Sequence, residues 1–394
     1  INAAYAYGGA VMAKQTVANL LRVPIHYYAL GNCALFCHHK YIFIFKSASG
    51  WKVGINSDWH GRIIASFHVI CYNLQIMEIK VDRKAAVKKL KALVLSPKNE
   101  VEAFRSKLEK KFKADFIPNH VERTEKKIGG VKCDILVPEI FASNRIVIYV
   151  HGGSFVGGSR DSWRSFCSIF ANAVSAKVVV PEFRLAPSYP FPSSIEDVEK
   201  VFSGILEDDE SKEIILAADG SGASIALGLM LRTEEKKRSL VSKIILISPW
   251  LDLSTENLSN KKIRDEVLGN EDLRHASDLY TYSSNLKNIQ VSPLFASEND
   301  FSTFPEVYIQ CGEKEILLDS AESLAQKIIY SGGKCVLDVW PEMMFMFQMA
   351  DEFLLESHEA VEKIGHYINK RNGLSESEIK ERERLMRENN IAVE

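Results

Sequence analysis

The hydrophobic pattern of the chain is helical over one early segment. Between Asp82 and Phe112, apolar residues recur every three or four positions, first at Val87, Leu90, Leu93 and Val94, then at Val101, Phe104, Leu108 and Phe112. Lysines lie between them, as on the solvated face of an amphipathic helix. Pro97 interrupts the pattern. This spacing predicts two helical stretches separated near Pro97.

The pattern then changes to one typical of strands. Lys132–Val137 alternates between polar and apolar residues, and Gly129-Gly130 before it is typical of a hairpin turn. Short runs rich in β-branched residues follow, and each predicts a buried strand: Ile146–Val150, Ala176–Val180, Glu213–Ala217, Lys243–Ile247, Glu306–Gln310 and Cys335–Val339.

Helical patterns separate these runs. They cover Trp163–Val174, Ser194–Leu206, Ser221–Leu231 and Asp319–Tyr330. Short apolar strands that alternate with helices predict an α/β fold, in which helices cover both faces of a mostly parallel sheet.

Composition narrows the class of protein. The 394 residues are 46% hydrophobic and 25% charged, with a formal net charge of −2. These values are typical of a soluble globular protein, argue against wholesale disorder, and exclude nucleic-acid binding through bulk charge. Residues 1–80 carry seven Lys/Arg and two Asp/Glu, together with many tyrosines. A contact of this part with a membrane surface is therefore one hypothesis.

Cysteine usage indicates a reducing compartment. The seven cysteines have no regular spacing, which favours reduced thiols and a cytoplasmic location over a disulfide framework. Cys33, Cys37, His38 and His39 form a cluster, but no second ligand pair follows, so we expect no metal site. The chain begins at Ile1, which suggests a fragment or a processed product, and we recognise no signal peptide.

A glycine-rich turn carries the first candidate chemistry. His151-Gly152-Gly153-Ser154 directly follows the predicted strand Ile146–Val150. Adjacent glycines let the backbone turn sharply and bring its N–H groups close to a ligand. In hydrolases such N–H groups stabilise the oxyanion of a tetrahedral intermediate. The sequence therefore offers His151, Gly152, Gly153 and Ser154, together with Ser221 further along the chain, as candidate oxyanion or ligand-binding residues.

Further motifs follow in a characteristic order: Phe183-Arg184-Leu185-Ala186-Pro187, Ser248-Pro249-Trp250 and Ser292-Pro293-Leu294. With the glycine turn, they make residues 121–368 resemble the hormone-sensitive-lipase branch of α/β-hydrolase-fold esterases. The resemblance implies an eight-stranded, mostly parallel sheet with a helical cap. It divides the chain into an extension of unclear fold (1–80), a cap segment (81–120), a hydrolase-like domain (121–370) and a charged tail (371–394).

Esterases of this kind use a nucleophilic Ser, an acid and a His, in that order along the chain. The family's Gly-Asp-Ser-Ala-Gly-Gly turn aligns with Ala218-Asp219-Gly220-Ser221-Gly222-Ala223, which places Gly220 at the nucleophile position. Glycine has no side chain with which to attack. The other alignment makes Ser221 the nucleophile, but it places Asp219 where the tight turn needs a small residue.

The other two triad positions also depart from the family. Glu315 stands at the acid position, where a glutamate can still serve, or where it is only a partly exposed loop carboxylate. Phe345 stands at the His position, and its ring cannot accept a proton. His358 is thirteen residues further on, and we expect it to be a surface histidine. The resemblance therefore implies a degenerate triad.

Three functional hypotheses remain open at this point. The chain is a catalytically silent member that binds a small acyl or carboxylate ligand in a cavity opened by Gly220. Alternatively, it is an active ester hydrolase that uses Ser221 or a bound water. In the third hypothesis it is a protein-interaction module with a vestigial pocket. None of the three requires a cofactor.

Overall fold

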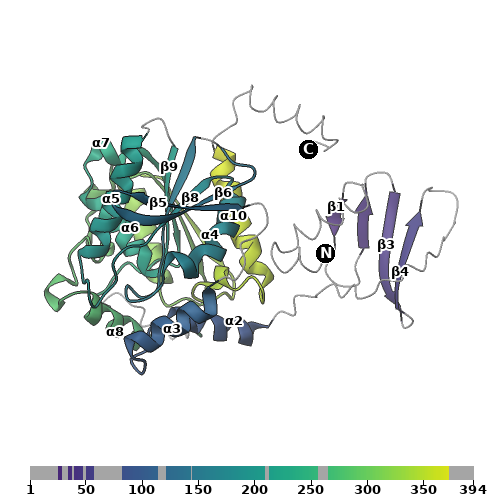
Figure 1. The fold of residues 1–394 in the computed structure, drawn as a ribbon, viewed down its shortest axis with the longest axis horizontal. Coiled ribbons are helices and arrows are strands. Elements are labelled where there is room, and N and C mark those ends of the chain that lie inside the picture. Colours follow the sequence, from purple (N-terminus) through teal and green to yellow (C-terminus); the bar gives the residue numbers. More distant parts are fainter. Residues whose placement is uncertain are drawn as a thin grey trace. The chain divides into compact units, whose positions relative to one another are not determined.

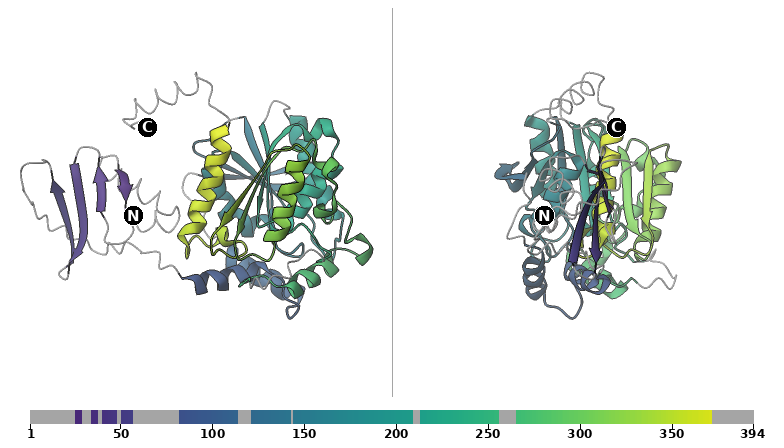
Figure 2. Two further views of the ribbon diagram at one scale, coloured as in Figure 1. Left: turned by 180° about the vertical axis from the view of Figure 1, so that it is seen from behind. Right: turned by 90° about the vertical axis from the view of Figure 1, so that its right-hand side faces the viewer.

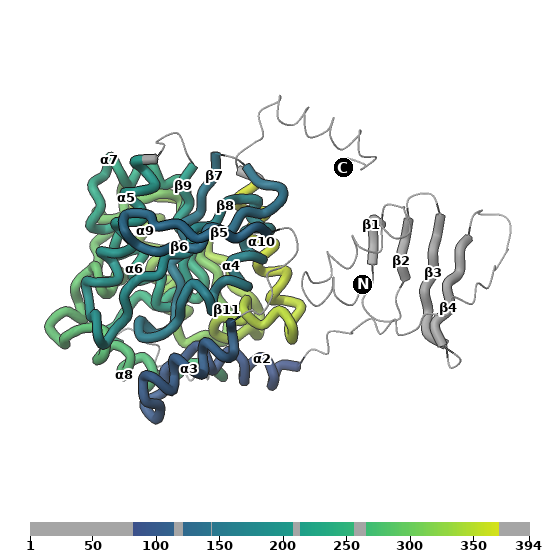
Figure 3. The backbone as a smooth tube through the Cα atoms, in the orientation of Figure 1, coloured from purple at the N-terminus to yellow at the C-terminus, as the bar shows by residue number. Residues whose placement is uncertain are grey.

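A computed structural model describes two separate compact units of the chain, formed by residues 82–368 and by residues 1–81 with 369–394. In the tube drawing, the residues that the structure does not describe are grey or a thin trace (Figure 3). The backbone is described at 25–28, 34–37, 40–47, 50–56, 82–113, 121–142, 144–208, 213–255 and 265–371.

The unit that contains the N-terminal residues holds a four-stranded antiparallel sheet. Its strands pair in chain order as β1 Ile25–Tyr28, β2 Ala34–Cys37, β3 Lys40–Ser47 and β4 Gly50–Asn56. The hydrophobic pattern did not predict this sheet. The side chains of residues 1–80, and with them the Cys33–His39 cluster and the hypothesis of membrane contact, lie outside the described residues.

The larger unit is built on an eight-stranded sheet with the order β12-β11-β10-β9-β7-β8-β6-β5 (Figure 1). The strands from β12 to β8 run parallel, and the hairpin β5–β6 joins them antiparallel. The bounds are β5 Val121–Ile128, β6 Val131–Pro138, β7 Arg145–Val150, β8 Lys177–Pro181, β9 Glu213–Asp219, β10 Val241–Ile247, β11 Glu306–Gly312 and β12 Cys335–Trp340.

Helices cover the two faces of this sheet (Figures 1 and 2). On one face α4 packs against α10, so closely that a Cβ on Gly365 would lie 2.2 Å from the Ala173 carbonyl. On the other face α5 packs against α6. The bounds are α4 Arg160–Val174, α5 Ser193–Asp208, α6 Gly220–Arg232, α7 Glu235–Arg238, α8 Asn270–Tyr280, α9 Leu318–Tyr330 and α10 Leu355–Arg371.

Two helices precede the sheet along the chain. Asp82 begins α2 Arg83–Leu90 by accepting a hydrogen bond from the Ala85 N–H. The segment around Pro97 then separates α2 from α3 Val101–Phe112. The one-turn 3₁₀ segments are η1 Lys91–Leu93, η2 Ser283–Asn285, η3 Pro293–Phe295, η4 Glu298–Phe301 and η5 Phe347–Met349.

The structure confirms the predicted α/β architecture. Each predicted strand and helix from Asp82 onward is present, with ends that shift by a few residues. The hairpin turns at Gly129-Gly130, where both glycines have positive φ. β9 continues past its predicted end to Asp219, so that α6 begins at the very next residue. None of the helices that the structure describes has both the length and the apolar character needed to cross a bilayer.

One buried charge cluster ties the antiparallel edge of the sheet to α4. Asp134 on β6 is fully buried and accepts hydrogen bonds from Arg123 on β5 and from Arg160 and Arg164 on α4, at 2.7–3.0 Å. Burial alone would raise the pKa of Asp134, but hydrogen bonds from Arg123 and Arg164 outweigh it and hold the pKa below its ordinary value. This carboxylate therefore stabilises the fold in its charged form.

Asp134→Asn is expected to lower the free energy of unfolding by about 3 kcal/mol at pH 7, because three arginines lose their buried counter-charge. Since the folded pKa is depressed, the contribution of Asp134 is present above the ordinary Asp pKa and is lost as the pH falls through the folded value. Urea titrations at pH 7 and pH 3 check this.

Glu125→Gln is the matched control for this prediction. Glu125 pairs with Arg160 and lies near Arg123, but its side chain is 45% exposed, so its loss should cost much less. Equal losses from the two variants would contradict a special role for the buried carboxylate.

Candidate functional site

The candidate site residues lie where neighbouring parallel strands end. β7 ends before His151, β9 before Gly220, β10 before Ser248, and β11 and β12 shortly before Glu315 and Phe345. Parallel strands present their carboxyl ends at one edge of a sheet, and ligand sites of α/β folds lie in the crevice outside that edge. The tertiary structure thus gathers segments that are up to about 200 residues apart.

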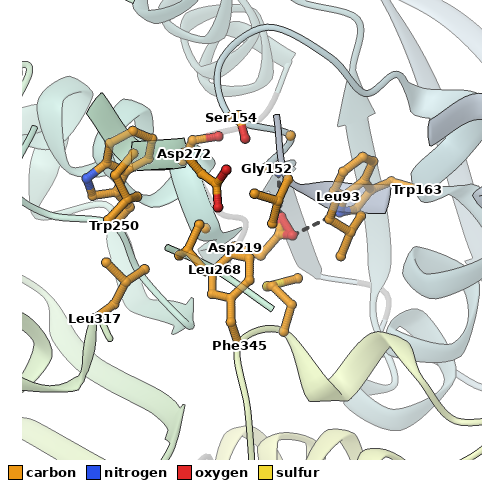
Figure 4. A pocket seen from close by; sticks show the side chains of 16 residues that line it. Leu93, Gly152, Ser154, Trp163, Asp219, Trp250, Leu268, Asp272, Leu317 and Phe345 are labelled. Atoms are coloured by element: carbon orange, nitrogen blue, oxygen red, sulfur yellow. Dashed lines mark hydrogen bonds between the residues drawn. The ribbon is translucent and has the colours of Figure 1, made fainter. Parts of the chain in front are cut away.

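A small cavity lies at this edge (Figure 4). Its volume is about 20 Å³, which leaves room for roughly one water molecule. Leu93 and Val94 close it from the segment after α2, and Leu268, Leu273, Leu317 and Trp250 form much of its apolar wall. The polar lining residues are Ser154, Asp219, Ser221 and Asp272.

Gly220 lies at the turn from β9 into α6. Its φ is +46°, in the left-handed region that favours glycine, and this is the strained geometry of a nucleophile elbow. A Cβ built on Gly220 would lie 3.4 Å from Cζ of Phe345. The structure therefore brings together the two residues that the family alignment assigns to the nucleophile and the base.

Phe345 fills the space next to this turn. Its ring is buried and lines the cavity together with Asp219 and Leu317 (Figure 4). A cavity opened by Gly220 was expected from the sequence, but the ring occupies the adjoining volume. The contact at this position is therefore one of apolar packing.

Ser221 is the second residue of α6 and is only 3% exposed. Its hydroxyl accepts a hydrogen bond from the Phe155 N–H at 3.1 Å, which ties the turn after β7 to α6. Within the described part of the chain, no histidine lines the cavity beside Ser221.

The His151 side chain lies beside the cavity but does not line it. Its ring is buried between Trp163 and Phe183, with ring centroids 4.9 and 4.3 Å away. Burial lowers the pKa of His151 to about 4, so the ring is neutral at pH 7, and Nδ1 lies 2.8 Å from the Gly152 carbonyl oxygen. His151 therefore packs the turn, while Gly152, Gly153 and Ser154 face the cavity.

The turn after β7 has an unusual backbone. Gly153 has a φ of +104° and Ser154 one of +58°. The Gly152 N–H donates to Asp219, and the Ser154 hydroxyl accepts the Leu95 N–H at 3.3 Å. No acceptor in the described residues takes the N–H groups of Gly153 or Ser154, so these two remain available to a ligand.

Asp219 is a site residue that sequence reasoning treated only as a flanking position. It is fully buried and accepts hydrogen bonds from the Gly152 N–H at 2.6 Å and from the Trp163 indole at 3.0 Å (Figure 4). Burial raises the pKa of Asp219 to about 7, although these two hydrogen bonds oppose the shift. The sequence signal that could have identified Asp219 as a site residue was its position directly before Gly220.

Glu315 is fully buried, which corrects the reading of a partly exposed loop carboxylate. One oxygen accepts hydrogen bonds from the Ser248 hydroxyl and the Gly312 N–H, both at 2.7 Å. The other oxygen has no partner in the described structure. Burial raises the pKa of Glu315 well above its ordinary range. The acid position thus holds a carboxyl group that favours its neutral form.

His358 also differs from its expectation as a surface residue. Its side chain is only 18% exposed, and Nε2 lies 3.3 Å from a carboxylate oxygen of Glu362 on the same helix. It is absent from the lining of the cavity. In the described residues, no group of three or more His, Cys, Asp or Glu is arranged to hold a metal ion.

Comparisons with known proteins agree with this geometry. A family model for the alpha/beta hydrolase fold matches residues 147–349, about half of the chain. An acetyl-hydrolase of Streptomyces hygroscopicus is 30% identical over 232 residues, which cover 58% of this chain and 77% of that protein. An esterase of Acinetobacter venetianus is 29% identical over 245 residues, which cover 61% and 80%.

Solved structures show the same likeness. A hormone-sensitive lipase from a metagenome library superposes with a TM-score of 0.66 at 28% identity, and the match covers 74% of this chain and 99% of that one. An esterase of the bacterial hormone-sensitive lipase family superposes with a TM-score of 0.67 at 24% identity and covers 74% and 98%. The second likeness concerns the fold alone.

Glu315→Gln is expected to change the pH dependence of stability. A raised folded pKa means that the wild type loses stability as the pH rises from the ordinary carboxyl value toward the folded one. The glutamine cannot ionise, and its amide would lie at the oxygen that lacks a partner. The two proteins should differ by less than about 1 kcal/mol at pH 5, and the variant should be the more stable at pH 9.

Chemical unfolding of both proteins across this pH range is the measurement. Glu298→Gln, an exposed carboxylate, is the control and should follow the wild-type curve. Parallel pH curves for wild type and Glu315→Gln would show that Glu315 is ionised in the folded protein.

Proposed function

The chain belongs to the alpha/beta hydrolase fold family, with esterase- and lipase-like relatives, and we propose that it has lost serine-hydrolase chemistry and acts by binding. The observation that carries this proposal is the Phe345 ring beside Gly220. An ester hydrolase needs a nucleophile and a proton acceptor in contact at this point, and these two residues supply neither.

Losing both the nucleophile and the base argues more strongly against ester hydrolysis than losing either one. Triad residues act as a unit, so that an acid alone contributes little once nucleophile and base are missing. Here the acid position has a buried carboxyl group whose hydrogen-bonded oxygen is engaged by Ser248 and Gly312. Each of the three positions therefore favours packing over proton transfer.

The size of the cavity bears on what is bound. About 20 Å³ admits a water molecule but no acyl chain. A small acyl or carboxylate ligand would have to displace Phe345, or Leu93 and Val94. The observation in favour of such a ligand is the pair of N–H groups on Gly153 and Ser154, which have no described acceptor. The small volume of the cavity favours a binding surface on the outside of the fold.

An active ester hydrolase is the second candidate function. Asp219 favours it, because a carboxyl group with a pKa of about 7 lines the same cavity and could accept a proton from a water beside Gly220. Ser221 is the other candidate nucleophile, but its hydroxyl already accepts the Phe155 N–H.

Short-chain nitrophenyl esters separate these proposals. We expect wild type and Ser221→Ala to show no turnover above a catalytically inert control protein. The double variant Gly220→Ser/Phe345→His should gain about 10²-fold or more, because it restores a nucleophile and a base at positions already in contact. Initial rates at pH 7–8 are the measurement.

The single variants Gly220→Ser and Phe345→His serve as controls and should stay at background, since neither completes the pair. Wild-type turnover that Ser221→Ala abolishes would establish Ser221 as the nucleophile. Wild-type turnover that persists in Ser221→Ala and disappears in Asp219→Asn would instead support an activated water. Either result would overturn the proposed loss of chemistry.

A thermal-shift screen tests the small-ligand alternative. We expect short carboxylates such as acetate and butyrate to leave the melting temperature of the wild type unchanged, because the cavity has no room for them. Phe345→Ala enlarges the cavity and should melt lower, in line with a loss of about 3–5 kcal/mol for a buried Phe. Stabilisation of the wild type by a carboxylate would favour the acyl-pocket ligand.

A further inference from the structure

An open groove with a volume of about 1010 Å³ runs along α2, η1 and α3. Its lining is apolar or small at Val87, Ala92, Ala103 and Ser106. The remaining lining residues are all lysines: Lys84, Lys88, Lys91, Lys107, Lys110 and Lys111. Both helices lie along one edge of the larger unit (Figure 1).

The segment that forms the groove is strongly basic, whereas the whole chain has a slightly negative net charge. Residues 82–113 contain eleven Lys/Arg and four Asp/Glu, in a protein whose net charge is −2. Three of the four acids are engaged within the fold. Asp82 caps α2, Glu102 pairs with Arg105, and Glu109 accepts hydrogen bonds from Ser159 and Ser162. Among the residues that the structure describes, no carboxylate lines the groove.

The six lysines differ from the basic residues that stabilise the fold. Lys89 is buried, pairs with Glu352 and lies over the Phe112 ring. Arg105 donates to the carbonyls of Val156 and Ala186. In contrast, the six groove lysines are exposed, and none forms an ion pair with a carboxylate of the described residues.

The spacing of these lysines places like charges side by side. Lys84, Lys88 and Lys91 follow one another at helical intervals of four and three residues, and Lys107, Lys110 and Lys111 share a face of α3. Like charges at such spacing repel and destabilise a helix. The fold alone therefore gives no reason for the charge of the groove.

We propose that this groove binds an acidic segment, rich in Asp and Glu, of a partner protein. Each side contributes three ammonium groups, and the small apolar floor between them can accept a peptide backbone and short side chains. The proposal rests on the binding role proposed above, for which it identifies a surface. It does not depend on the loss of ester hydrolysis.

The shape and composition of the groove favour a peptide over other anions. A bilayer surface would meet the rims of a concave groove but would not reach its floor. Single-stranded nucleic acids are held by aromatic platforms as well as by positive charge, and none of the described residues that line this groove is aromatic.

Neither terminal segment of the chain complements the charge of the groove. Residues 1–80 are basic, with seven Lys/Arg and two Asp/Glu. Residues 371–394 contain five Lys/Arg and six Asp/Glu, interspersed along the segment, so that their charges largely cancel. The occupant is therefore expected to be another protein.

Fluorescence anisotropy with the full chain tests this proposal. The probe is a fluorescein-labelled peptide of alternating Glu and Ala, and the same peptide with Gln for Glu is the neutral control. We expect binding of the Glu peptide alone at about 50 mM salt, with marked weakening at about 200 mM as the charges are screened. The variant Lys84→Gln/Lys88→Gln/Lys91→Gln should weaken binding about tenfold or more.

The matched control is Lys236→Gln/Lys237→Gln/Lys334→Gln, which removes the same charge from exposed lysines outside the groove. It should change the affinity less than about twofold if the groove is the site. All substituted residues are exposed, so circular dichroism should show both variants folded. Equal weakening by the two triple variants, or no binding of the Glu peptide by the wild type, would overturn the proposal.

Two further probes decide the class of partner. Vesicles that contain phosphatidylserine, and a single-stranded oligonucleotide, should bind more weakly than the Glu peptide. Stronger, groove-dependent binding of either one would overturn the acidic-peptide assignment. The variant Gly220→Ser/Phe345→His should bind the peptide as the wild type does. The proposal of lost esterase activity and the proposal of a peptide-binding groove can therefore be overturned independently of each other.

Discussion

The Asp219 carboxylate is the point on which the geometry of the site depends. It accepts hydrogen bonds from the turn after β7 through Gly152 and from α4 through Trp163, and it lies directly before the Gly220 turn. The turn after β7 and the start of α4 are thereby held to the end of β9, which lies 67 and 56 residues further along the chain. The approach is tight, since a Cβ on Gly222 would lie 2.2 Å from the Val150 carbonyl oxygen. The turn, the loop and the start of α6 therefore constrain one another.

This arrangement keeps the backbone geometry of a hydrolase elbow, with Gly220 and Phe345 at the positions that the family alignment assigns to the nucleophile and the base. The left-handed turn at Gly220 and the positive φ of Gly153 persist, although such strain is usually retained where function needs it. Around them, Phe345 and the cap residues Leu93 and Val94 leave room for about one water. Tight apolar packing beside the Gly220 turn gives the binding proposal its physical basis.

Charge is distributed in two opposite ways in the larger unit. Buried carboxylates are compensated, as for Asp134 among three arginines, or favour the neutral form, as for Glu315. The groove lysines on α2, η1 and α3 form no ion pair with a carboxylate of the described residues. Exposed charge costs little free energy in water and attracts opposite charge, so the groove lysines suit recognition. The buried carboxylates suit stability.

The sequence by itself determined the α/β fold and indicated which residues align with the triad positions of the family. Strand runs and helical spacing depend on local side-chain patterns, and the motifs aligned Gly220, Glu315 and Phe345 with the family positions. Only the tertiary structure decided that Phe345 fills the space beside Gly220, that Glu315 is buried, that Asp219 joins the site, and that six lysines share one groove. Burial and proximity arise from contacts between distant segments, which no local pattern encodes. For the same reason, the sheet in residues 25–56 was missed, since strand pairing rather than spacing reveals it.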